Sequence, residues 1–198
     1  MDGVFMRKRI IICASLLLAA LTMTAAALQQ EQAALSEKLI RLHVVANSDS
    51  REDQQIKLQV RDAVLQITGA LDREALISAL PAIEAAAKTR LRELGREDAV
   101  TVTFGKERFP TRVYGNFALP AGVYQSLRVT IGEGEGQNWW CVAFPSLCFR
   151  ATAAELKEAA VSAGFTDTEV KLITEEGGYV LKFKTLELLE RLKSFLFA

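Results

Sequence analysis

The sequence predicts an α+β fold, in which a single domain carries a mostly antiparallel sheet with helices packed on one face. Segments such as Val100–Phe104 and Leu127–Ile131 alternate apolar and polar residues, as half-buried strands do. Apolar residues from Ile56 to Ile67 recur at helical spacing. The 198 residues, half of them apolar, suit one domain with a sizeable core.

An N-terminal targeting segment precedes this domain. Arg7-Lys8-Arg9 stands before an uncharged run from Ile10 to Leu28, and Ala25-Ala26-Ala27 has the small side chains of a signal peptidase site. We therefore expect residues 1–27 to be a signal peptide and residues 28–198 an exported α+β domain. The alternative is an uncleaved membrane anchor, because about 20 apolar residues span a bilayer. Under both interpretations the domain lies outside the cytoplasm.

The first half of the domain is predicted to alternate strands and helices. Asp49 with Glu52 resembles a capping box that starts a helix, and Pro81 is expected to kink or divide the next helical region, because proline lacks a backbone donor. The expected elements are a buried strand at Leu39–Ala46, a helix ending at Gly69, a helical region from Asp72 to Gly95, a strand at Val100–Phe104 and a short extended piece at Phe109–Tyr114.

The second half is predicted to contain two hairpins. Gly132–Asn138 is expected to join the strand at Leu127–Ile131 to a fully buried strand at Trp139–Phe144 as an antiparallel hairpin. Gly177-Gly178 marks the second hairpin. The elements expected after residue 150 are a helix at Ala153–Ala163, strands at Val170–Thr174 and Tyr179–Lys184, and a final amphipathic helix over Leu188–Leu196.

Charge and composition exclude several function classes. Lys plus Arg equals Asp plus Glu at 24 each, and removal of residues 1–27 leaves the domain slightly acidic. Nucleic acids and anionic lipids attract clustered cations, so we expect no nucleic-acid partner and no membrane contact beyond the leader. The glycine loop Gly132–Gly136 carries two glutamates and runs from strand to strand, unlike a phosphate-binding loop. We expect no cofactor, and His43, the only histidine, cannot form a histidine-pair zinc motif.

The cysteines divide by position. Cys13 lies in the leader, which leaves Cys141 and Cys148 as an even pair in the exported part. Outside the cytoplasm such a pair can oxidise and persist. A disulfide between them is one interpretation and would contribute about 2–3 kcal/mol for so short a loop. Two buried thiols packed as small apolar groups are the other.

Polar residues gather just after the only histidine, at the junction between a predicted strand and a predicted helix. Capping orphan amides explains most of this cluster, but it needs only one or two such side chains, so the surplus is a candidate surface for contact with a partner. Neither nearby serine has the flanking glycines of a nucleophile elbow, which counts against a catalytic role for His43. We therefore expect His43 to be a structural residue whose ring nitrogens bond to the polar loop. The residues of this candidate surface are His43, Asn47, Ser48, Asp49, Asp53 and Gln54.

Trp139 and Trp140 are further candidates for partner binding. Adjacent residues of a strand point to opposite faces, so the two rings cannot share one environment. One ring is expected to fill the core. The other must be covered by a helix or left exposed, and an exposed tryptophan is a frequent interface anchor.

Two segments resemble the stage II sporulation protein R family, secreted signalling proteins of spore-forming bacteria. They are LIRLHVVANSDSREDQQIKLQVRDAV at Leu39–Val64 and YGNFALPAGVYQSLRVTIGEGEGQNWWCVAFPSLCF at Tyr114–Phe149. The resemblance implies export across the forespore membrane into the space between the two cell membranes. It also implies a protein partner, a membrane-embedded aspartyl protease of the mother cell that processes the precursor of sigma factor E.

On this resemblance the chain is expected to be an activating ligand and not an enzyme. Two alternatives belong to other classes. One is an exocytoplasmic hydrolase that uses His43 with Asp49 or Asp53, since paired carboxylates can do acid–base work across a cleft. The other is a structural septal protein held by its uncleaved leader. The absence of a cleft near His43 would count against the hydrolase.

Overall fold

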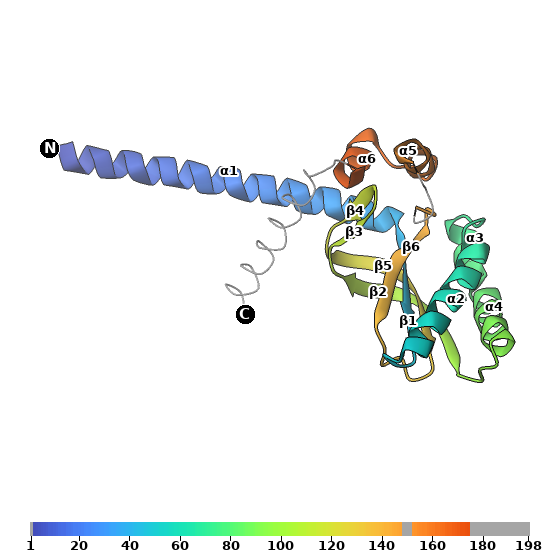
Figure 1. The fold of residues 1–198 in the computed structure, drawn as a ribbon. Coiled ribbons are helices and arrows are strands. Elements are labelled where there is room, and N and C mark those ends of the chain that lie inside the picture. The colour runs from blue at the N-terminus through green and yellow to red at the C-terminus, as the bar shows by residue number, and fades with distance from the viewer. Residues whose placement is uncertain (1, 148–151, 175–198) are drawn as a thin grey trace.

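A computed structural model describes residues 2–147 and 152–174 (Figure 1). Helix α1 extends as a single rod, and the other elements fold beside its C-terminal end. Among these residues, no helix combines the length and the hydropathy of a membrane span. In chain order the elements are α1 (Asp2–Lys38), β1 (Ile40–Val45), α2 (Arg51–Thr68), α3 (Arg73–Ser78), α4 (Leu80–Glu93), β2 (Val100–Phe109), β3 (Arg112–Tyr114), β4 (Phe117–Leu119), β5 (Gly122–Ile131), β6 (Asn138–Phe144), α5 (Ala153–Ser162) and α6 (Asp167–Thr174).

The main sheet has four strands in the order β2-β5-β1-β6. β5 pairs with β2 in antiparallel and with β1 in parallel orientation, and β1 pairs with β6 in antiparallel orientation. A second, small sheet pairs β3 with β4. The predicted α+β class with a mostly antiparallel sheet is therefore confirmed.

The predicted hairpin between β5 and β6 is wrong, because β1 lies between these two strands. The loop 132–137 crosses the C-terminal end of β1 instead of making a tight turn. Its amides bind the chain that leaves β1: Gly136 N donates to Ala46 O at 3.0 Å and Glu135 N donates to Asn47 O at 3.1 Å. Gly136 is needed at this crossing, since a Cβ there would overlap the carbonyl of Ser48.

The helix boundaries follow local signals, with one correction. α2 begins after Ser50, whose hydroxyl accepts a hydrogen bond from Asp53 N at 3.0 Å, so the predicted capping box of Asp49 and Glu52 is wrong. Pro81 divides the next region into α3 and α4 as expected, because the first turn of a helix does not need the missing N–H. Gly95 ends that region with a φ of 73°, a conformation that favours glycine.

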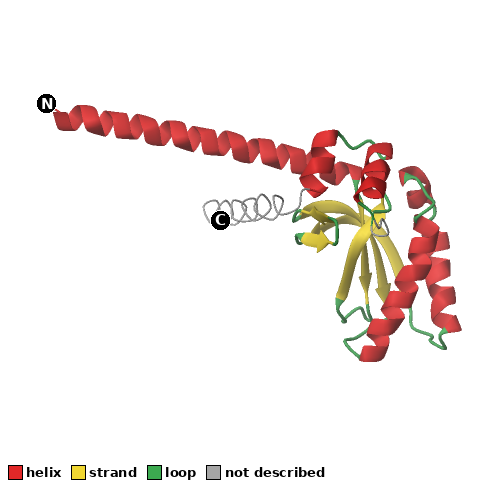
Figure 2. Cartoon of the chain, turned by 45° about the horizontal axis from the view of Figure 1, so that its top comes forward, coloured by secondary structure: helices red, strands yellow, loops and turns green. Residues whose placement is uncertain are grey.

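The sheet separates two hydrophobic clusters, since alternate residues of a strand face opposite sides. On one face, Leu42 and Val44 of β1 belong to a cluster with Val60 of α2 and Leu91 of α4. Figure 2 shows these helices running along one side of the sheet. The second cluster joins the β3–β4 sheet to the end of α1, α5 and α6. The prediction that helices pack on one face of the sheet therefore applies to α2, α3 and α4, whereas α5 and α6 belong to the second cluster.

The region after residue 150 contains a second correction. α5 matches the predicted helix and begins with a capping box between Thr152 and Glu155. Val170–Thr174, predicted as a strand, lies in helix α6. Glu169 N donates to the Thr166 hydroxyl at 3.2 Å, and the Glu169 carboxylate accepts from Thr166 N at 2.7 Å, so another capping box starts this helix. The predicted elements at residues 179–184 and 188–196 lie outside the described residues.

Candidate partner-binding site

The polar loop after β1 is centred on Asp53, which is only 6% exposed. Its Oδ2 accepts hydrogen bonds from the Ser48 hydroxyl at 2.6 Å and from Asn47 Nδ2 at 3.0 Å. Its Oδ1 pairs with Arg96 at 3.0 Å. The Ser48 hydrogen bond is the main reason that the pKa of Asp53 lies below its ordinary value; burial opposes this, and Asn47 and Arg96 add to it.

Gln54 and Lys57 tie α2 to the loop that precedes β6. Gln54 Nε2 donates to Ser48 O at 2.9 Å, and its Oε1 accepts from Lys57 Nζ at 2.6 Å. The Lys57 ammonium also donates to Gln137 O at 2.8 Å. Burial lowers the pKa of Lys57, an effect that the charge of Asp49 opposes.

Asn47 and Asp49 also bind the crossing loop. Asn47 Oδ1 accepts from Glu133 N at 3.0 Å, and Asp49 Oδ1 accepts from Gln137 N at 2.7 Å. We call the bonded set of residues 46–54 and 132–138 the loop clasp. Its internal bonds use the polar side chains that exceed the needs of helix capping, so the surplus alone does not indicate a partner.

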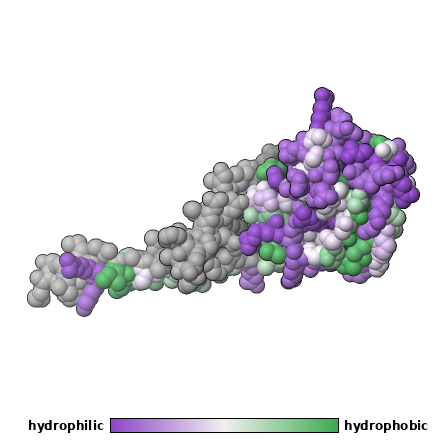
Figure 3. All heavy atoms as spheres, turned by 90° about the horizontal axis from the view of Figure 1, so that it is seen from below, coloured by the Kyte–Doolittle hydropathy of each residue, from purple (hydrophilic) through white to green (hydrophobic). Residues whose placement is uncertain are grey.

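The loop clasp nevertheless leaves carboxylates at the surface. Both of its loops lie at the lower end of the molecule in Figure 1. Asp49, Glu133 and Glu135 are exposed there, and we call these three the acidic tip. Among the described residues, the Glu133 and Glu135 side chains have no hydrogen-bond or ion-pair partner. Figure 3, seen from below, shows mostly hydrophilic residues over this face of the folded unit.

The two tryptophans point to opposite faces of β6, as predicted. Trp139 packs against the cluster beneath α2, where the guanidinium of Arg61 lies 4.7 Å from its ring. Trp140 lies on the other face and stacks on His43 with 3.8 Å between ring centroids. Both rings are half-buried, so the prediction that one ring fills the core is wrong, and neither ring is a fully exposed anchor.

His43 is only 3% exposed and is satisfied from two other strands. Its Nδ1 lies 2.8 Å from Glu107 of β2, and its Nε2 lies 2.6 Å from Asn138 Oδ1 of β6. The prediction that the polar loop satisfies His43 is therefore wrong. Sequence gives no sign of these partners, because they depend on the register of separate strands.

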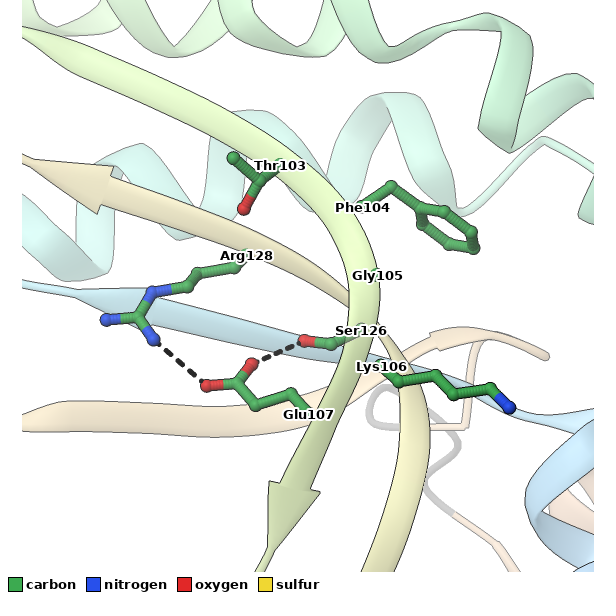
Figure 4. Close-up of a pocket in the computed structure, with 7 residues that line it drawn as sticks. All are labelled: Thr103, Phe104, Gly105, Lys106, Glu107, Ser126 and Arg128. Carbon is green, nitrogen blue, oxygen red and sulfur yellow. Dashed lines mark hydrogen bonds and ion pairs between the residues drawn. The ribbon is translucent and has the colours of Figure 1, made fainter.

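The hydrolase alternative required His43 to work with Asp49 or Asp53, and the structure does not bring these groups together. Both aspartates bond to residues of the loop clasp, whereas His43 bonds to Glu107 and Asn138 and to neither aspartate. A cavity of about 340 Å³ lies beside Glu107, although His43 does not line it. The only serine at that cavity, Ser126, donates to Glu107 at 2.8 Å (Figure 4). A serine nucleophile would need its hydroxyl bonded to a base such as the imidazole. Among the described residues, no His, Cys, Asp and Glu side chains cluster as metal ligands.

Arg41 is a buried cation that the sequence prediction missed. It has no exposed surface, and its guanidinium lies 4.4 Å from the Phe109 ring. Its Nε donates to Cys141 O at 3.1 Å and its Nη2 to the Tyr114 hydroxyl at 2.8 Å, whereas its Nη1 has no partner among the described residues. A charged residue inside the apolar run of β1 was the available signal.

The predicted disulfide is only partly within the described residues. Cys13 is free and exposed, and Cys141 is buried and takes part in a disulfide. Cys148 lies outside the described residues, so its pairing with Cys141 stays a prediction.

Fold and site together define an α+β domain in which a polar loop is bonded internally and presents carboxylates. The family model described as stage II sporulation protein R matches residues 36–154. The stage II sporulation protein R of Bacillus subtilis (strain 168) is 39% identical over 161 residues, covering 73% of this chain and 72% of that protein. No solved structure matches the chain. The chain therefore belongs to the stage II sporulation protein R family, as its resemblance predicted, and has a role in sporulation.

Proposed function

We propose that this protein is an exported signal of sporulation that activates a membrane-embedded aspartyl protease of the mother cell. The activated protease processes the precursor of sigma factor E. The observation that carries this proposal is the match to the family. The match covers residues 36–154 and so includes both segments on which the resemblance rests, Leu39–Val64 and Tyr114–Phe149. The lack of a serine–histidine pair at the described cavity supports a binding role over hydrolysis.

The acidic tip is the surface that we assign to the protease. The loop clasp holds the tip in place through hydrogen bonds to the backbone of Glu133 and Glu135. A rigid loop loses little conformational entropy on binding, which favours affinity. In this proposal Asn47, Ser48, Asp53 and Gln54 position the tip, while His43, Trp139 and Trp140 support it from within the sheet. On the sequence alone, all of these residues are candidate contacts. In this proposal only the acidic tip contacts the protease, and the other residues hold the tip in position.

The test is a double variant, Glu133→Gln with Glu135→Gln, in sporulating cells. We expect processing of the precursor to fall strongly, while the melting temperature stays within a few degrees, because surface changes usually cost less than about 0.5 kcal/mol. Glu74→Gln with Glu158→Gln removes the same charge from exposed sites on α3 and α5 and serves as the control. Normal processing by the tip variant would remove the tip from the proposal.

A further inference from the structure

The outer edge of β2 is a second surface, separate from the acidic tip. We propose that its central part, Phe104–Lys106, binds an extended, acidic segment of a partner protein as an added strand. The proposal does not depend on the activation of a protease, since it follows from the edge itself.

The hydrogen-bond pattern shows which backbone groups of β2 face outward. Gly132 N donates to Ala99 O at 2.8 Å, so the odd-numbered residues of β2 bond to β5. In an antiparallel ladder the alternate residues then direct both backbone groups away from that neighbour. Val102, an even-numbered residue, agrees with this pattern, since its N–H points away from β5 and donates to Glu84 on α4 at 3.4 Å. The next outward residues are Phe104 and Lys106, whose backbone groups have no partner among the described residues.

The surface at this point is hollow instead of covered. The cavity of about 340 Å³ is lined by Thr103–Glu107 of β2 and by Ser126 and Arg128 of β5. A Cβ at Gly105 would meet nothing within 4 Å, so the strand has free space at its centre. Figure 4 shows Glu107 and Arg128 on one side of β2 and Phe104 and Lys106 on the other. An added strand would therefore meet side chains on both faces, which is how sheet edges give specificity to peptides.

The positive charge at this edge favours an acidic segment as the added strand. Lys106 is exposed, and the Arg128 side chain is 41% exposed. The nearby carboxylate of Glu107 is already bonded to His43, Ser126 and Arg128. A lysine on an edge strand also discourages pairing with a second copy. The cavity and the glycine are features that such protection does not need.

The probe is an acetylated and amidated ten-residue peptide of alternating Glu and Val, added to the full chain. Hydrogen exchange should show new protection at Phe104 and Lys106, and binding should saturate. A peptide N-methylated at alternate residues cannot complete the ladder and should bind at least about tenfold more weakly, since more than one hydrogen bond to the edge would be lost. A peptide with Lys in place of Glu should also bind more weakly.

Two variants of Lys106 separate the contribution of its backbone N–H to binding from the contribution of its charge. Lys106→Pro removes an outward N–H, a change that edge strands tolerate, and should abolish protection. Lys106→Gln keeps the N–H and should weaken binding only a few-fold. Equal binding of the N-methylated peptide to the unaltered chain, or protection confined to other segments, would overturn the proposal even if the proline variant misfolds. Protection that rises with protein concentration without peptide would show that the occupant is a second copy, and would also overturn it.

Discussion

Replacing Asp53 by Asn tests whether the loop clasp is a structural unit. The substitution keeps the shape of the side chain but removes its charge and one of its two acceptor oxygens. Asp53 is nearly buried and takes hydrogen bonds from Ser48 and Asn47 and an ion pair from Arg96. An asparagine cannot satisfy all three partners.

The expected cost follows from these contacts. Hydrogen bonds to charged groups contribute about 1.5–3 kcal/mol each, and the Arg96 pair contributes less because Arg96 is partly exposed. One orientation of the amide keeps the bonds at Oδ2, so we expect a net loss of about 2–4 kcal/mol. For a domain of this size that corresponds to a fall in melting temperature of about 5–15 °C.

The loss should depend on pH in a defined direction. The folded-state pKa of Asp53 lies below its ordinary value of 3.8. A lowered carboxyl pKa gives stability that is present above the unfolded pKa and disappears as the pH falls through the folded pKa. The difference between the two proteins should therefore be equal at pH 7 and pH 5 and should shrink below about pH 4.

Urea unfolding of the full chain, followed by circular dichroism at pH 7, 5 and 3, measures this difference. Asp62→Asn, on the same helix but with a side chain 53% exposed, is the control and should change stability by less than about 0.5 kcal/mol. An Asp53→Asn protein as stable as the original at pH 7 would show that the Asp53 carboxylate does not stabilise the loop clasp. So would a loss that persists unchanged at pH 3.

Three further predictions concern the leader, the cysteines and the crossing loop. Bulky residues at Ala25 and Ala27 should leave an unprocessed form about 2.5–3 kDa heavier, because the peptidase accepts small side chains; full-length unaltered protein in the membrane fraction would contradict cleavage. Residues 28–198, once unfolded, should show no free thiol in an Ellman titration if Cys141 pairs with Cys148, whereas two thiols in protein prepared without reductant would reject the pair. Gly136→Ala should lower the free energy of unfolding by at least about 2 kcal/mol, because its Cβ would overlap Ser48 O; an unchanged urea midpoint would show that the loop can shift.

Local signals in the sequence were enough to place most helices. Asp72, Pro81 and Gly95 set the limits of α3 and α4, since each acts on the backbone within one turn. The order of the strands was not predictable, because alternation shows which face a strand buries but not which strand lies beside it. α6 was missed for another reason: its β-branched residues favoured a strand, although Thr166 and Glu169 carried a capping signal.

The sequence predicts which residues form the site better than it predicts what each of them does. The polar residues after β1 do form one bonded cluster. Their roles depend on partners far along the chain, such as Arg96, which lies 43 residues after Asp53. Glu107 illustrates the same limit, since it reaches His43 only through the pairing of β2, β5 and β1. Such contacts are set by register, which no local pattern encodes.

We propose that the protein acts as a signal outside the cell that makes it. The most direct measurement is an immunoblot for the sigma factor E precursor in sporulating Bacillus subtilis that lacks its own stage II sporulation protein R. The full chain should restore processing, whereas residues 28–198 without the leader, produced to the same level in the forespore, should not. Restoration by the leaderless chain, or failure of a stably produced full chain, would show that the protein does not act as an exported signal.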